Sequence, residues 1–425
     1  MTASPSSNSK PRSTAWKWWI CGLLLCASTI NYTDRVTLST IATRITAQFQ
    51  LTQEHYGNIE TGFGLAFATG SLLFGLIADR FPVRWVYPSA LFLWSAAGFM
   101  TGFARNYQEL LYCRIALGLF EGGHWPCAIK TTRWLLEPGD RSMGNSVLQS
   151  GTSIGAIITP LLMRFLLTPE PESWRPAFQI IGAAGLLWIV AWFALIRSQD
   201  LPTRNPGKPE PNAVGNTTED TPTHPNDSLW SAIFSRRMLV IFVVIALINT
   251  WWQLLRAWLP KVLQEGRGYT EKQVLEFLPF FYVATDIGVI GAGALTLWLH
   301  RRGATVHGSR LTAFGTCAIL SALAVVAAFT PHGPWLLIML MIMGAGALGV
   351  FPIYHALTQD FPARHQGTIS GLGGVAAWAL SPAQKYYGRL VDRTGSFDLG
   401  FAVAGAMPFI AFLVLLFLWP RTQRN

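Results

Sequence analysis

Two stretches of this sequence place acids and bases within apolar, glycine-rich surroundings. Residues 31–35 read N-Y-T-D-R, and residues 114–130 read R-I-A-L-G-L-F-E-G-G-H-W-P-C-A-I-K. Ionisable groups at membrane depth are costly unless they face a protein interior or a water-filled cavity, so they indicate a functional path. Asp34 and Glu121 can take up and release protons, and a guanidinium binds a carboxylate through two hydrogen bonds. The two stretches therefore predict chemistry with protons and organic anions.

The spacing of these residues indicates which of them share a helix face. Arg114 and Glu121 are seven residues apart, two helical turns, and so share one face. Asp34 and Arg35 are adjacent and point about 100° apart on a helix, so they can serve two partners. Desolvation and a nearby arginine act on the pKa of a carboxyl group in opposite directions, which suits both acids to carrying protons. The alternative reading, a helix that ends near Ile30 and leaves this pair in solvent, stays open.

Further polar and aromatic side chains are needed to hold a hydroxylated substrate. His124 can titrate near neutral pH or act as a neutral hydrogen-bonding residue. Arg256 can face a central cavity or extend towards the membrane–water interface. Asp286 is a candidate partner for it. The full set of candidate substrate-binding residues is Tyr32, Arg35, Arg114, His124, Trp125, Gln149, Gln253, Arg256 and Trp378.

The composition is that of a membrane protein. Of 425 residues, 51% are hydrophobic and 13% are charged, against about 25% charged in soluble proteins. The net charge of +10 comes largely from short basic runs between apolar segments, so we expect no nucleic-acid partner. Nucleotide-binding and zinc motifs are absent from the sequence, so we expect no cofactor, no metal and no enzymatic activity. The first apolar segment lacks a cleavage pattern and reads as a retained helix.

Twelve segments have the roughly 20 apolar residues that a membrane span needs. They lie at residues 16–38, 54–78, 85–104, 108–133, 142–167, 175–197, 238–262, 273–299, 309–330, 334–359, 366–389 and 398–419. We therefore expect an all-α membrane protein of twelve transmembrane helices.

A polar, proline-rich stretch divides these spans into two sets of six. We expect a tail at 1–15, a six-helix bundle at 16–197, a linker at 198–235, a second bundle at 236–420 and a tail at 421–425. Asp79 and Arg80 correspond to His300 and Arg301 at an offset of 221 residues. Parallel six-helix repeats place a site between the halves near mid-membrane. At a similar offset Asp34 corresponds to Arg256. One half would then place an acid, and the other a base, at the central site.

Basic residues beside the spans predict the orientation. One side would carry Arg80, Arg84, Arg141, Arg197, Arg301, Arg302, Arg364, Arg421 and Arg424. The exceptions on the other side are Arg105, Arg175, Arg267 and Arg393. We expect both termini and the linker in the cytoplasm, with the protein embedded in the cytoplasmic (inner) membrane.

The loop after the second span reads G-L-I-A-D-R-F-P-V-R, residues 75–84. It resembles the signature loop of the major facilitator superfamily, with Pro82 where glycine is usual. The resemblance implies that charge pairs form across a cytoplasmic gate. The residues that it implicates in gating are Gly75, Asp79, Arg80, Arg84 and Arg141.

The patterns N-Y-x-D-R and R-x-x-x-G-x-x-E together resemble the anion:cation symporter branch of that superfamily, and E-x-G-x-W-P is most similar to its hexuronate transporters. The resemblance implies that Asp34 and Glu121 carry protons, that the arginines interact with a carboxylate or tune those acids, and that Tyr32 lines the substrate site. Related sugar-acid transporters have a tyrosine where this chain has Phe67, which leaves substrate identity open.

The prediction from sequence is a proton-coupled symporter of a small organic anion, with a hexuronate or related sugar acid as first choice. The alternatives are a facilitator or exchanger of another carboxylate, such as an aldonate, aldarate or aromatic acid, and a non-transporting sensor of the same fold. We expect a monomer surrounded by membrane lipid, with protons and the anion as its partners.

Overall fold

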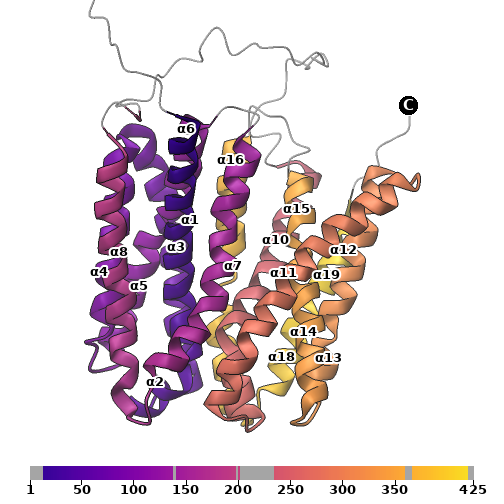
Figure 1. The fold of residues 1–425 in the computed structure, drawn as a ribbon. Helices are drawn as coiled ribbons and strands as arrows, with labels where there is room; N and C mark the ends of the chain where they lie inside the picture. Colours follow the sequence, from indigo (N-terminus) through magenta and orange to yellow (C-terminus); the bar gives the residue numbers. More distant parts are fainter. Residues whose placement is uncertain (1–12, 137–139, 198–199, 202–233, 359–365, 420–425) are drawn as a thin grey trace, which may run out of the picture.

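The computed structural model describes residues 13–136, 140–197, 200–201, 234–358 and 366–419. Its helices form two groups that follow the order of the chain (Figure 1). The N-terminal half contains α1 (Thr14–Thr40), α2 (Ala42–Gln48), α3 (Gln53–Arg80), α4 (Val83–Thr101), α5 (Tyr107–Glu121), α6 (His124–Leu135), α7 (Arg141–Leu166), η1 (Pro171–Trp174) and α8 (Arg175–Leu195).

The C-terminal half, drawn in orange to yellow, lies beside the first (Figure 1). It contains α10 (Arg236–Lys261), η2 (Val262–Gly266), α11 (Glu271–Arg301), α12 (Val306–Ala322), α13 (Ala324–Ala327), α14 (Pro334–Gly349), α15 (Phe351–Thr358), α16 (Gln366–Ala379), α17 (Ala383–Thr394), α18 (Asp398–Gly405) and α19 (Met407–Leu418). We call the end at which α1 ends and α3 begins the Arg44 end, and the opposite end, at which α10 begins, the Arg236 end.

Eight helices in the described ranges are long and apolar enough to cross a membrane. The other four expected spans correspond to α1 and α4, which carry Arg35 and Arg84, and to the broken pairs α5–α6 and α16–α17. The helix order is consistent with the expected twelve-helix fold of two related halves. The predicted tails and linker lie almost entirely outside the described residues.

The expected span 108–133 is broken into α5 and α6 at two glycines. A Cβ added at Gly122 would lie 2.5 Å from the Ser71 nitrogen of α3, and one at Gly123 would lie 2.8 Å from the Phe74 ring. Side chains at these positions would force the two helices apart. The glycines therefore allow α3 and the α5–α6 segment to pack closely, as small residues do in membrane helices.

An aromatic cluster joins the two halves near the Arg44 end. The Trp258 ring of α10 lies 4.9 Å from the Tyr56 ring of α3 and 4.7 Å from the Tyr387 ring of α17, measured between centroids. The Tyr56 hydroxyl donates a 2.8 Å hydrogen bond to the Ala257 carbonyl oxygen. Burial of such large rings, with their polar atoms bonded, fixes α3 against α10 and α17.

Candidate functional site

The N-Y-T-D-R stretch lies inside a continuous helix. Helix α1 extends to Thr40, well beyond Ile30. Asp34 is 0% exposed and Arg35 is 6% exposed. This excludes the reading of a helix that ends in solvent at these residues, and it places both charges in the protein interior.

Arg35 and Glu121 form the ion pair that connects the two stretches. The Arg35 Nε donates to Glu121 Oε2 over 2.9 Å, and its Nη2 donates to Asn31 Oδ1 over 3.0 Å. The guanidinium carbon lies 4.4 Å from the centroid of the Phe67 ring. Phe67 thus provides an aromatic face for the cation. The two charged stretches of the sequence thus meet where α1 lies against the end of α5.

Arg114 lies fully buried behind this pair. Its Nη1 lies 3.5 Å from the Asp34 carbonyl oxygen, and its Nη2 lies 3.8 Å from Glu60 Oε1. Among the described residues, neither carboxylate oxygen of Asp34 has a hydrogen-bond partner. Gly98 of α4 also lies against this acid, because a Cβ added there would be 3.2 Å from Asp34 Oδ1. Asp34 is thus a buried acid beside a buried base.

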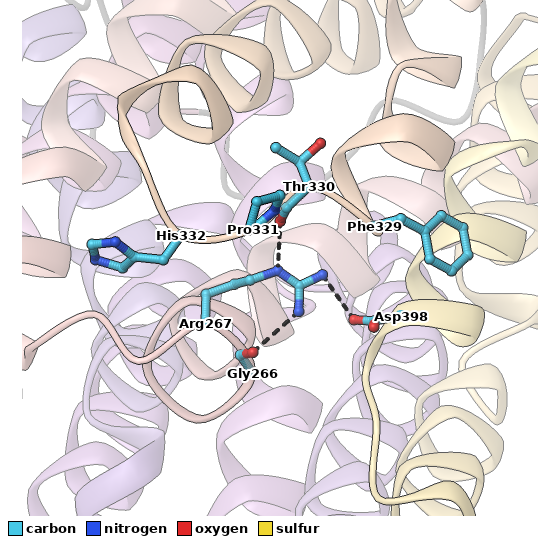
Figure 2. A pocket seen from close by; sticks show the side chains of 7 residues that line it. All are labelled: Gly266, Arg267, Phe329, Thr330, Pro331, His332 and Asp398. Atoms are coloured by element: carbon cyan, nitrogen blue, oxygen red, sulfur yellow. Dashed lines mark hydrogen bonds and ion pairs between the residues drawn. The ribbon is translucent and has the colours of Figure 1, made fainter.

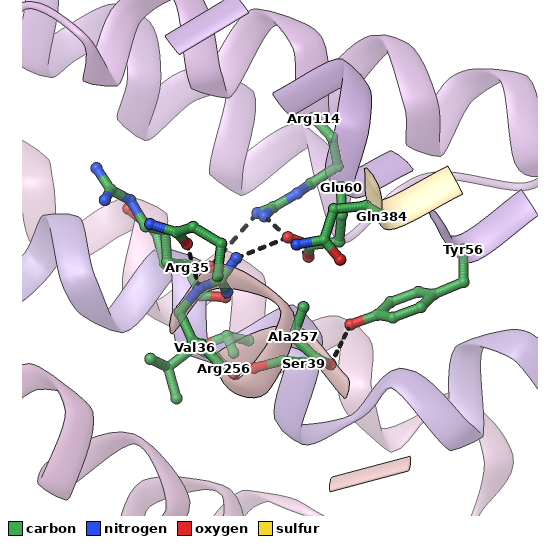
Figure 3. A network of polar contacts seen from close by, with 12 residues as sticks. Arg35, Val36, Ser39, Tyr56, Glu60, Arg114, Arg256, Ala257 and Gln384 are labelled. Atoms are coloured by element: carbon green, nitrogen blue, oxygen red, sulfur yellow. Dashed lines mark hydrogen bonds and ion pairs between the residues drawn. The ribbon is translucent and has the colours of Figure 1, made fainter. Parts of the chain in front are cut away.

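Arg256 extends from the C-terminal half into this cluster and is 1% exposed. Its Nη2 donates to Glu60 Oε2 over 2.7 Å, its Nη1 to the Arg35 carbonyl oxygen over 3.1 Å, and its Nε to Gln253 Oε1 over 3.0 Å. Figure 3 shows Arg114 and Arg256 converging on Glu60 from α5 and α10. The burial excludes the reading in which Arg256 extends towards an interface.

Glu60 is the charged site residue that the sequence interpretation missed. It is 2% exposed and lies on α3 within I-E-T-G-F-G, an otherwise uncharged run inside an expected span. The same rule that singled out Glu121, an acid at membrane depth, applies to it. The other candidate partner of Arg256 is engaged differently, because Asp286 accepts a 2.8 Å hydrogen bond from the Ser153 hydroxyl of α7.

His124 lies in the interior of the N-terminal half. Its Nε2 is 3.0 Å from the Ser28 hydroxyl oxygen, and its Nδ1 is 2.9 Å from the Tyr87 hydroxyl oxygen. Trp125 packs edge-on against the imidazole at 5.0 Å between centroids. A neutral imidazole has one donor and one acceptor nitrogen, and both are used here. This geometry favours the neutral hydrogen-bonding alternative and ties α1, α4 and α6 together.

Aromatic and amide side chains cover the cluster from the second half. The Trp252 Nε1 of α10 donates to the Tyr32 hydroxyl over 3.2 Å, and the Trp378 ring lies 5.1 Å from that of Phe67. A cavity beside Arg256 is lined by Glu60, Thr250, Gln253, Leu254, Ala377, Trp378, Leu380, Ser381, Ala383 and Gln384. Gln149 lies apart from this lining, as an exposed side chain on α7.

Within the described residues, three of the expected gating residues contact groups of their own half. Asp79 Oδ1 lies 3.1 Å from Lys130 Nζ of α6, the last residue of the second charged stretch. Arg84 Nε donates to the Ile196 carbonyl oxygen over 3.1 Å, and Arg141 Nε donates to that of Leu136 over 3.2 Å. Arg80 is exposed, and the backbone of Gly75 has open space on its Cβ side.

A second pocket opens at the Arg44 end of the C-terminal half (Figure 2). Arg267 dominates it, with Nη2 2.8 Å from Asp398 Oδ1 and Nε donating to the Thr330 carbonyl oxygen over 3.0 Å. This guanidinium ties the loop after α13 to the start of α18. The pocket contains none of the charged residues around Arg35 and Arg256, so we interpret it as part of the packing between a loop and α18.

Ion pairs also connect the two halves at the Arg44 end. The Arg44 guanidinium binds both carboxylate oxygens of Glu271, over 2.6 Å and 2.5 Å. Arg389 Nη2 lies 2.6 Å from Glu54 Oε1. The two halves are thus linked at this end and, through Arg256, at the centre.

Comparisons with known proteins agree with this architecture. The sequence profile of the Major Facilitator Superfamily matches residues 24–384. The probable sulfoacetate transporter SauU of Cupriavidus necator is 28% identical over 408 residues, which cover 94% of this chain and 93% of the relative. The hexuronate transporter of Bacillus subtilis is 25% identical over 406 residues, 92% of each chain.

A solved structure with the same fold is that of a bacterial homolog of the human lysosomal transporter Spinster. Its TM-score is 0.71 at 17% identity, and the match covers 96% of this chain and 95% of that one. The helix order, the profile match and these relatives agree. The chain therefore belongs to the major facilitator superfamily and is an integral membrane transporter rather than an enzyme.

Proposed function

We propose that this transporter is a proton-coupled symporter of a small organic anion, with a hexuronate or related sugar acid as the first candidate. The observation that supports the proposal best is the buried Arg35–Glu121 pair at 2.9 Å beside the buried acid Asp34. The named substrates of the relatives, hexuronate and sulfoacetate, are anions. A guanidinium that is released from an internal carboxylate is suited to bind such an anion.

The pair couples the proton to the substrate by competition for one guanidinium. When Glu121 takes up a proton, its charge is lost, and Arg35 becomes available to the substrate carboxylate. Asp34 is the second proton carrier, because an acid without hydrogen-bond partners in a buried site is stabilised by protonation. Tyr32 and Trp378 frame the substrate, since both approach the Arg35 guanidinium at 5.9 Å from their ring centroids.

The halves would rock around this site in the membrane. We propose that the Arg236 end faces the cytoplasm, together with both termini, and that the protein lies in the inner membrane. Arg80, Arg301 and Arg302 are exposed at that end, which fits the excess of basic residues in cytoplasmic loops. One chain suffices for this cycle, because the site lies between the halves of a single chain.

A second candidate substrate class is an anion with two acidic groups, such as sulfoacetate or an aldarate. Arg256 favours it, because this base comes from the half opposite Arg35 and offers a separate position for a second anionic group. A hexuronate carries one acidic group. Competition of sulfoacetate and galactarate against galacturonate in a binding assay separates the two classes.

Uptake into reconstituted vesicles tests the coupling. We expect an imposed proton gradient to drive accumulation of the substrate by the wild-type protein, and Glu121→Gln to abolish that accumulation, because the amide cannot carry the proton. Exchange of labelled for unlabelled substrate should survive, since it needs no net proton movement. Gradient-driven accumulation that is unchanged in Glu121→Gln contradicts the assignment, and accumulation insensitive to the gradient in the wild type indicates a facilitator or exchanger.

A further inference from the structure

Glu60 occupies an unusual position in the cavity beside Arg256. Nine of the ten lining residues belong to the C-terminal half, and the tenth is Glu60 of α3. The polar lining side chains of the C-terminal half are Thr250, Gln253, Ser381 and Gln384. A carboxylate from one half therefore enters a small cavity of the other half and binds Arg256 beside it.

We propose that Glu60 is an internal carboxylate that holds Arg256 while no substrate is bound, and that it takes up a proton to release Arg256 to an acidic group of the substrate. The proposal rests on the proposed function and adds a third proton-linked acid to it. In this state Glu60 makes the contact that a substrate carboxylate would make, with its Oε2 2.7 Å from Arg256 Nη2. The residues that line the small cavity next to it would face the rest of the substrate.

Two arginines face Glu60, so the exchange requires a substrate anion to replace its charge between them. Arg256 of α10 and Arg114 of α5 face its two oxygens at 2.7 Å and 3.8 Å. Tyr56, one turn earlier on α3, donates to a backbone carbonyl, and the side chain of Arg35 is directed to Glu121. The cavity-lining residues of α16 and α17 are uncharged. Two ionised carboxylates on one buried guanidinium repel each other, so the substrate anion binds Arg256 when Glu60 is neutral.

The position of the pair also links it to the movement of the halves. Glu60 belongs to the N-terminal half and Arg256 to the C-terminal half, so any separation of the halves at this level breaks the pair. A buried charge that loses its partner is strongly destabilising. Protonation removes the charge of Glu60, and the substrate anion replaces it at Arg256. On release of the substrate and the proton the Glu60–Arg256 pair forms again, which restores the unloaded state.

Proton uptake on binding tests the proposal. Calorimetric titrations with sulfoacetate and galacturonate, in two buffers of different ionisation enthalpy, count the protons taken up. We expect Glu60→Gln to take up about one proton fewer than the wild type, because linkage assigns one proton to each group that is neutralised on binding. The amide carries no charge to compete with the anion for Arg256, so the variant should bind these anions at least about tenfold more tightly than the wild type.

Two further variants keep the interpretation clear. Glu54→Gln removes another acid of α3 that pairs across the halves, with Arg389, but at the Arg44 end. It should take up as many protons as the wild type. Glu121→Gln should lower the count through the separate Arg35 pair.

Equal proton uptake by Glu60→Gln and the wild type overturns the proposal, as does weaker binding by Glu60→Gln at every pH, which marks a purely structural ion pair. Neither result bears on proton coupling through Glu121, which is tested separately by uptake into vesicles with Glu121→Gln.

Discussion

The two ends of the molecule use similar ion pairs in different ways. At the Arg44 end, acids and bases pair between the halves, as in Arg44 with Glu271 and Arg164 with Glu276. At the Arg236 end, Asp79 pairs with Lys130 of its own half. Pairs of the first kind hold the halves together, whereas the Asp79–Lys130 pair stabilises one half. In the proposed orientation, the side facing away from the cytoplasm is closed.

Packing of glycines shows the same difference. Gly57 of α3 lies against the backbone of Gln384, and Gly388 of α17 lies against that of Gln53, so that a Cβ at either position would clash with a carbonyl group of the opposite half. Gly75, near the Arg236 end, has no atom within 4 Å of an added Cβ. Close backbone contact between the halves therefore accompanies the ion pairs at the Arg44 end.

The largest expected effect comes from Gly57→Leu, because a backbone contact has no room to yield. The halves would not close at the Arg44 end, and we expect substrate uptake to fall by about a hundredfold, which corresponds to a clash of about 3 kcal/mol. A cysteine introduced by Ser381→Cys, which is 8% exposed where α3 meets α17, should react faster with a maleimide. The reporter requires a background without the five native cysteines.

Gly293→Leu is the matched control, since an added Cβ at Gly293 of α11 meets no atom within 4 Å. It should retain uptake and leave the reporter cysteine protected. If Gly57→Leu also transports normally and keeps Ser381→Cys protected, the close contact at the Arg44 end is not needed for closure.

Much of the fold could be predicted from the sequence because span length and hydrophobicity are local properties. The breaks within the spans could not be predicted, because they depend on the neighbouring helix. Helix α5 ends at Glu121, and the next residue, Gly122, lies against α3. An interaction between the arginines and the acids of the two charged stretches was expected from the family resemblance, although the specific pairing of Arg35 with Glu121 was not. The partner of Arg256 could not be predicted, because it depends on how α3 and α10 cross. The distance between Glu60 and Arg256 is not encoded in either helix alone.

The next effect in size is expected for Arg44→Gln. Arg44 binds both oxygens of the partly buried Glu271 and donates to the Thr168 carbonyl oxygen over 2.7 Å. Hydrogen bonds to charged groups contribute about 1.5–3 kcal/mol, so its loss should increase the labelling rate of the Ser381→Cys reporter by about tenfold or more. Arg105→Gln, at an exposed arginine near the same end, is the control. Equal labelling of Arg44→Gln and the wild type would show that the pair does not hold this end closed.

The smallest effect is expected for Asp79→Asn. The Asp79 side chain is 70% exposed, and exposed ion pairs contribute about 0–1 kcal/mol. Because its partner Lys130 belongs to the same half and also donates to the Ala78 carbonyl oxygen, the Ser381→Cys reporter should react within about twofold of the wild-type rate. If Asp79→Asn increased the labelling rate as much as Arg44→Gln does, this loop would help to hold the opposite end closed. The two ends would then be coupled.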